Sequence, residues 1–155
     1  MKSKYLIVII SGILGAILAT AFSIGIEILI DMYFWIAFTV IAGLIVGFSI
    51  KLSVLFTKLK DKTAVKIISV LSGLLVILLL QLVYYNFILE DQLKSEMINY
   101  PNVTMEQLNQ YLEYYSFPES VMDYYAEHSI LAYLELILLP LMSMKVALSA
   151  FEVKL

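Results

Sequence analysis

Four long apolar runs dominate this chain, and their lengths decide what it can fold into. They cover residues 5–30, 33–52, 64–89 and 129–151. A helix of about 20 apolar residues crosses the hydrocarbon core of a bilayer, and each run has roughly that length. Hydrophobic residues make up 62% of the 155-residue chain and charged residues 15%, unlike a typical soluble domain. The sequence therefore predicts an all-α, polytopic membrane protein with four transmembrane helices.

The lysines predict an orientation. Nine of the ten lie on one side of the implied membrane, at the two ends of the chain and around the loop between the second and third runs. Lys94 lies alone on the other side. Cytoplasmic segments beside spanning helices are enriched in lysine and arginine. We therefore expect cytoplasmic termini, an extracytoplasmic loop at residues 90–128 and a place in the plasma membrane. The use of lysine without arginine is typical of an AT-rich bacterium.

The first run has an alternative interpretation. Lys2 and Lys4, the apolar core and the segment Ala19-Thr20-Ala21 also fit a cleavable signal peptide. The apolar run nevertheless continues to Ile30, which the start of a mature soluble protein would not need. The length therefore favours a retained spanning helix.

Small residues recur at four-residue spacing in every run. Membrane helices approach one another where such residues share a face, and the second run holds a strict G-x-x-x-G. These faces predict packing within one chain or, as the less favoured alternative, a homo-oligomer. The stripes are Ser11-Gly15-Ala19-Ser23, Thr39-Gly43-Gly47, Ser69-Gly73 and Ser143-Ala147.

Three polar residues lie within the apolar runs, in the outer part of the predicted membrane: Glu27, Gln81 and Glu135. Charged groups at membrane depth are costly and usually face a bundle interior or a cavity. We therefore expect a candidate polar cluster, with Asp31 and His128 near its mouth. Such a cluster suits binding of a cation or a lipid head group, or proton relay.

A simpler interpretation stands beside this one. Glu27 near the end of its run is more readily explained as a hydrated interfacial residue. Glu135 is equally well explained as a protonated carboxyl that is hydrogen-bonded to Gln81 or to a tyrosine hydroxyl. The sequence leaves both alternatives open for Glu135.

The 90–128 loop is predicted to form a small helical cap between the third and fourth spans. Thr104 with Gln107 and Ser116 with Glu119 match the capping box, in which two residues satisfy each other's backbone donors. We expect one helix that ends at about Tyr115, and a second that runs on into the fourth span.

Tyrosine is concentrated around this cap, with seven of the eleven between residues 100 and 133. Tyrosine suits both a membrane interface and a protein-binding surface, and the interfacial role is the simpler explanation. The candidate interaction surface consists of Tyr111, Tyr114, Tyr115, Tyr124 and Tyr125.

Several functional classes find no support in the sequence. The chain has no cysteine and one histidine, so a zinc site is not expected. No nucleophile elbow, metalloprotease, P-loop or dinucleotide motif occurs. No basic aromatic face for nucleic acid occurs either. We therefore expect no catalytic residue, metal or cofactor, and no nucleic-acid partner.

The order of features from Gly12 to about Leu89 resembles a group of uncharacterised small bacterial membrane proteins. The similarity rests on the first-run segment Gly12-Ile-Leu-Gly15-Ala16, a short hairpin, the second-run segment Ala42-Gly43-Leu-Ile-Val-Gly47, a lysine-bearing loop and a third span. These are packing motifs, so the resemblance implies a four-helix fold and no particular activity.

These observations favour a non-enzymatic accessory or interaction protein that acts through its outer cap or its helix faces. Expected partners are membrane lipid and another membrane protein or a second copy. The alternative is a small transporter, or an ion- or proton-binding membrane protein, that uses Glu135. A membrane enzyme ranks third because no nucleophile or metal set is recognisable.

Overall fold

Helices make up the regular structure of this protein throughout the part that the computed structural model describes, residues 2–30, 35–88, 104–114, 116–127 and 129–152. Within these residues, four helices are long and apolar enough to cross a membrane. The expectation of an all-α fold with four such helices is confirmed. The elements are α1 (Lys2–Ile30), α2 (Trp35–Thr57), α3 (Lys62–Val83), the π-helical turn η1 (Tyr84–Ile88), α5 (Met105–Tyr114), α6 (Phe117–Glu127), α7 (Ser129–Leu148) and the 3-10 turn η3 (Ser149–Phe151).

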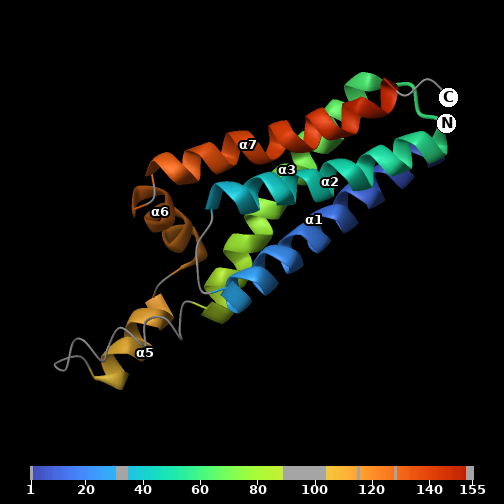
Figure 1. Ribbon diagram of the computed structural model, residues 1–155. Helices are drawn as coiled ribbons and strands as arrows, with labels where there is room; N and C mark the ends of the chain where they lie inside the picture. The colour runs from blue at the N-terminus through green and yellow to red at the C-terminus, as the bar shows by residue number, and fades with distance from the viewer. Residues whose placement is uncertain (1, 31–34, 89–103, 115, 128, 153–155) are drawn as a thin grey trace.

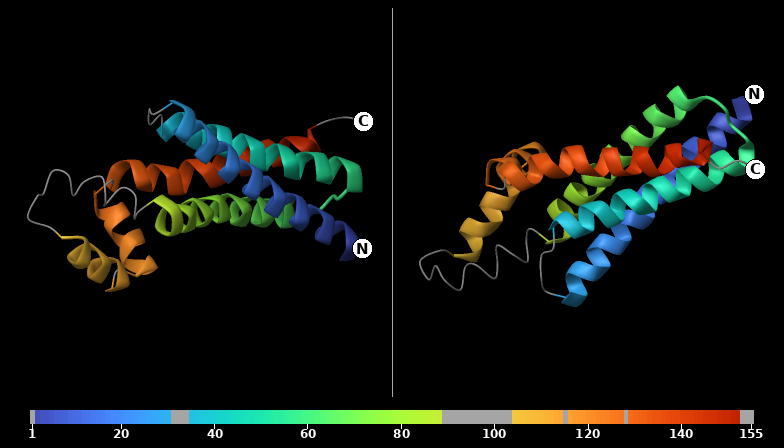
Figure 2. Two further views of the ribbon diagram at one scale, coloured as in Figure 1. Left: turned by 90° about the horizontal axis from the view of Figure 1, so that it is seen from below. Right: turned by 45° about the horizontal axis from the view of Figure 1, so that its top comes forward.

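The four long helices form one bundle (Figure 1). Around the bundle they follow the order α1, α2, α7, α3, and α2 also touches α3 across the middle. The start of α1, the α2–α3 turn and η3 lie at one end, whereas α5 and α6 lie at the opposite end (Figures 1 and 2). The lysine-rich segments therefore share one end of the bundle, and the cap occupies the other.

The outer surface of the bundle is apolar along its length. Large side chains that project outward include Leu18 on α1, Phe48 on α2, Leu71 on α3 and Ile137 on α7. A soluble protein rarely exposes so much contiguous apolar surface, whereas a membrane-spanning bundle turns such a surface to the lipid. The bundle therefore has the surface of a multi-pass membrane protein.

The small-residue stripes face other helices of the same chain. A Cβ atom added at Gly15 would lie 2.9 Å from Ser49 Cβ on α2, and one added at Gly73 would lie 2.9 Å from Pro140 Cα on α7. The closest approach to a backbone atom is at Gly47, where an added Cβ would lie 2.6 Å from the Ser143 carbonyl oxygen. The stripes are thus used for packing within one chain, as the favoured interpretation expected.

Buried hydroxyl groups in the bundle find acceptors on the backbone. Thr20 Oγ1 donates to the Ala16 carbonyl at 2.9 Å, one turn back along α1. Between helices, Ser143 Oγ donates to the Ser69 carbonyl at 3.1 Å and so joins α7 to α3. Because a lipid environment offers no competing water, these bonds remove the cost of burying hydroxyl groups.

The first helix is a member of the bundle. Val8, Ala16 and Ala19 are fully buried against the neighbouring helices. Of the two interpretations of residues 2–30, this packing favours the spanning helix over the signal peptide.

The α2 helix ends five residues beyond the predicted limit at Leu52 and is closed by a Schellman motif. The Leu59 N–H donates to the Val54 carbonyl at 3.3 Å, and the Lys58 N–H donates to the Leu55 carbonyl at 3.4 Å. Lys58 takes the left-handed conformation, with φ at 52°, that this motif requires. The lysine at position 51 suggested an earlier end of the helix. The helix instead continues to the residues whose carbonyl groups accept the two hydrogen bonds of the Schellman motif.

The next helix, α3, begins at Lys62 with Asp61 as its side-chain cap. Asp61 accepts a hydrogen bond from the Ala64 N–H at 3.0 Å, and Tyr5 Oη on α1 donates to the same carboxylate at 3.1 Å. The Ala64 N–H, the largest contributor, holds the pKa of Asp61 below its usual range, and the Tyr5 hydroxyl adds to this effect. Asp61 therefore ties the start of α3 to α1 at the lysine-rich end.

Candidate functional site

The α3–α7 interface has a defined register. Gly73 lies against the backbone of Pro140, and Ser69 receives the hydrogen bond from Ser143. The two helices run antiparallel, so positions further toward the cap on α3 meet earlier positions on α7. The close approach at Gly73 is possible because glycine has no Cβ. Pro140, on the other side of the contact, lies within the continuous helix α7.

This register places two of the expected polar residues toward the cap end of the α3–α7 pair. Continued toward the cap, it sets Gln81 at the level of Ala132, and Glu135 at the level of Ile77. The levels of Gln81 and Glu135 therefore differ by about one helical turn, roughly 5 Å along the bundle axis. Both are buried, with 7% of Gln81 and 8% of Glu135 exposed. The predicted pairing of these two residues is thus compatible with the observed packing.

Gln81 brings an unusual feature to this position. Its Oε1 atom is buried and has no hydrogen-bond partner among the described residues. A buried amide oxygen without a partner costs about 1–3 kcal/mol. Oε1 is therefore a strong acceptor that is available to a proton donor or a cation.

The cap helix α6 lies over this part of the bundle, held by aromatic contacts. Tyr85 in η1 meets Phe117 edge to face at a centroid distance of 5.6 Å. Tyr125 meets Tyr133 at the start of α7 at 5.9 Å. Edge-to-face aromatic pairs add stabilisation beyond the area that they bury. The contacts join α6 to the ends of both α3 and α7.

Tyr125 also approaches Glu135. Burial raises the pKa of the Tyr125 phenol above its usual range, and the negative charge of Glu135 raises it further. This effect of charge requires the carboxylate and the phenol to be near each other. A buried carboxyl group on α7 and a phenol hydroxyl on α6 thus lie near each other at the cap end of the bundle, the end toward which Gln81 also lies on α3. The groups are suited to hydrogen bonding and proton exchange.

The third expected member of the cluster has a different position. Glu27 lies on α1, and its side chain is outside the described part of the chain. Figure 2 shows the outer end of α1 standing apart from the outer end of α3. The participation of Glu27 stays a prediction, as does that of Asp31 and His128, which also lie outside the described residues.

The cap tyrosines divide into two groups. Tyr125 is half-buried, and its ring packs against Tyr133 within the chain; its place on the expected interaction surface stays a prediction. The side chains of the other candidates are outside the described part of the chain, and their role stays a prediction. They are Tyr111, Tyr114, Tyr115 and Tyr124.

The second cap helix also differs from expectation. It was predicted to run on into the fourth span, but α6 ends at Glu127, and α7 begins at Ser129 in a different direction (Figure 1). The turn lets α6 fold against the ends of the bundle. Phe117 and Tyr125, which are eight residues apart on α6, make the ring contacts with the ends of the bundle. Their helical spacing was a signal for this packed face.

Metal chemistry gains no support. Within the described ranges, no group of three or more His, Cys, Asp or Glu side chains is placed to hold a metal ion. The comparisons add no relative. Comparison of the chain with known protein families, with curated proteins and with solved structures found no match.

Proposed function

We propose that this protein is a non-enzymatic accessory protein that binds another membrane component through its outer cap. The observation that carries the proposal is the position of α5. Figures 1 and 2 show that α5 lies away from the four-helix bundle, whereas α6 packs on the end of the bundle. Thr104 and Gln107 cap α5, with the Thr104 N–H donating to Gln107 Oε1 at 2.9 Å. A capped helix held away from its own core is suited to docking on a partner.

The surface of the cap indicates the chemistry of that partner. Met105 and Met122 expose 51% and 70% of their surface, and methionine suits an adaptable binding face. Residues 104–127 contain five carboxylates and no lysine. We infer that the partner presents basic groups around an apolar patch. The carboxylates belong to Glu106, Glu113, Glu119, Asp123 and Glu127.

We also propose that the lysine-rich end is cytoplasmic and that the protein lies in the plasma membrane. Because the chain has no cysteine, single-cysteine variants report position directly. In intact cells, a membrane-impermeant maleimide is expected to label Gln110→Cys, whereas Lys60→Cys should react only after the membrane is opened. Labelling of position 110 from the cytoplasmic side alone would overturn this orientation.

The docking function is tested by photo-crosslinking in native membranes. A photoreactive amino acid at Met105 or Gln110 on α5 is expected to give the same protein adduct, and one at Leu71 on the lipid-facing side of α3 is not. The charge reversal Glu106→Lys should reduce the α5 adduct at least fivefold. The matched reversal Glu152→Lys at the other end of the bundle should leave it unchanged. Equal adducts from α5 and from Leu71 would contradict the proposal.

A second function is favoured by two buried polar residues, one on α3 and one on α7. Glu135 and the unpartnered Oε1 atom of Gln81 suit binding of a cation or transfer of protons. The two functions separate in vesicles that contain only the purified protein. If such vesicles move protons or a cation and Glu135→Gln stops this flux, the transport function holds and the accessory function fails.

A further inference from the structure

A small pocket lies at the lysine-rich end, between the end of α2 and η3. Its volume is about 200 Å³. The apolar side chains that line it come from both segments, and Leu59 and Ala150 among them are buried. Two lysines complete the lining. The lining residues are Val54, Leu55, Lys58, Leu59, Lys60, Ala150 and Phe151.

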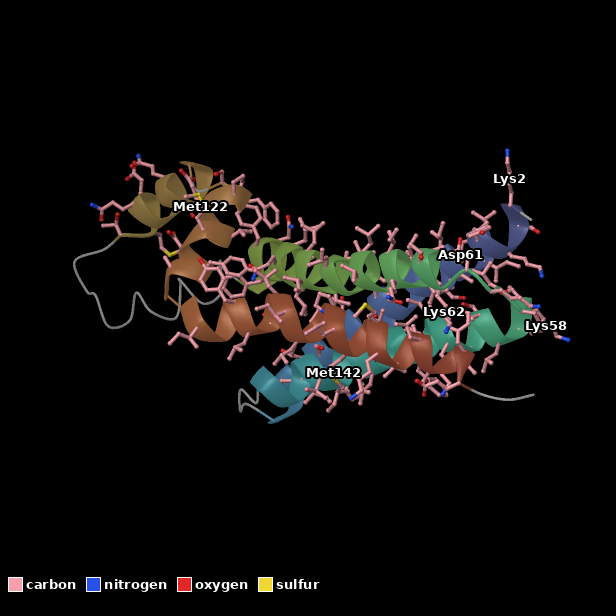
Figure 3. All side chains as sticks on the ribbon, turned by 90° about the horizontal axis from the view of Figure 1, so that it is seen from above. Lys2, Lys58, Asp61, Lys62, Met122 and Met142 are labelled. Carbon is pink, nitrogen blue, oxygen red and sulfur yellow. The ribbon has the colours of Figure 1, made fainter. Side chains whose placement is uncertain are left out.

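Positive charge predominates around this pocket. Lys62 Nζ lies 5.6 Å above the centre of the Phe151 ring and so adds a third cation beside the lining. Figure 3 shows Lys58 and Lys62 at the same end of the bundle, far from Met122 in the cap. Two acids are nearby in sequence. The carboxylate of Asp61 already accepts bonds from Tyr5 and Ala64, and the other acid is Glu152.

Lys58 occupies a backbone position that favours glycine. Its φ of 52° is left-handed, and the two Schellman hydrogen bonds fix it there. A lysine in this conformation makes the α2–α3 turn less stable than a glycine would. Lys58 is also one of the residues that line the pocket. A strained residue at a pocket points to a binding role for the Lys58 side chain.

We propose that this pocket binds one anionic phospholipid. The phosphate lies between the Lys58 and Lys60 ammonium groups, and the adjoining part of an acyl chain enters the apolar lining between Leu59 and Ala150. The ends of spanning helices lie at head-group depth, where lysines attract anionic lipids. A zwitterionic lipid gains less because its own ammonium group meets the same three lysines. The lipid thereby joins α2 to η3.

The test measures lipid retained by the purified full-length protein in detergent, by native mass spectrometry with added phosphatidylglycerol. The double variant Lys58→Gly/Lys60→Gln is expected to bind phosphatidylglycerol about 25-fold more weakly, at roughly fivefold for each lysine removed. The control Lys2→Gln/Lys66→Gln removes the same charge at the same end, outside the pocket lining, and should change binding less than twofold. Lys58→Gly alone should raise the unfolding temperature, so lost lipid is not a sign of lost fold.

Further measurements distinguish other occupants. Ala150→Leu fills the pocket and keeps every lysine, and we expect at least a fivefold loss of phosphatidylglycerol, measured below the unfolding temperature of the variant. Phosphatidylcholine with the same acyl chains should bind at least tenfold more weakly than phosphatidylglycerol. The proposal is overturned if both double variants lose lipid equally, if Ala150→Leu has no effect, or if inorganic phosphate at millimolar concentration displaces the lipid. None of these outcomes bears on the cap function.

Discussion

Gly47→Ala is expected to destabilise the bundle by about 1–3 kcal/mol, the usual cost of overpacking a close contact. The added Cβ would lie 2.6 Å from the Ser143 carbonyl oxygen and 2.7 Å from Val146 Cβ. The first atom belongs to the backbone of α7, and the second is fixed directly to it, so neither can move aside by a side-chain rotation. Helices α2 and α7 must therefore move apart along their contact. Thermal unfolding of the purified protein in detergent measures the effect.

Gly25→Ala supplies the matched control. It is the same substitution in another membrane helix, and the added Cβ meets no described atom within 4 Å. We expect it to be neutral or to stabilise by up to about 1 kcal/mol, because alanine favours helix more than glycine does. If Gly47→Ala and Gly25→Ala behave alike, the close α2–α7 contact does not determine stability.

Gln81→Leu is expected to stabilise the protein by about 1–3 kcal/mol, the cost of a buried polar group without a partner. The side chain is 7% exposed, and its Oε1 atom accepts no hydrogen bond within the described part of the chain, so the substitution removes none from this atom. Leucine has a similar volume and carries no polar atom. The unfolding temperature in detergent should rise accordingly.

The contrary result is equally informative. Gln110→Leu makes the same change at an exposed site on α5 and should leave the stability within about 0.5 kcal/mol. If Gln81→Leu lowers stability while Gln110→Leu does not, the Oε1 atom has a partner in the membrane. That outcome would favour cation or proton binding with Glu135 over the accessory function.

Much of the fold was predictable because the bilayer constrains it. Apolar length sets which segments span, so the four helices followed from residue pattern alone, as did the capping box of Thr104 and Gln107. The end of α2 did not. The lysine at position 51 marked the limit of a charge-free run, whereas the helix ends at Thr57, directly before the left-handed Lys58.

The candidate site was only partly predictable. Gln81 and Glu135 stand out in sequence because polar residues are costly in a membrane, but their spacing depends on the Gly73–Pro140 contact. The approach of Tyr125 depends on the break between α6 and α7. The pocket between α2 and η3 joins residues that are about ninety positions apart, and no local pattern indicates it.

The sequence by itself determined that this chain forms four membrane-spanning helices, with lysines at one end and an acidic cap at the other. Hydrophobic length and charge distribution are local properties of each segment, and they determine directly which segments span a bilayer. Tertiary structure alone decided which faces meet, which polar groups are buried together, that α6 packs while α5 stands free, and that Lys58 lines a pocket. These depend on contacts between segments distant in sequence, where the absence of one Cβ at Gly47 or Gly73 fixes how closely two helices approach.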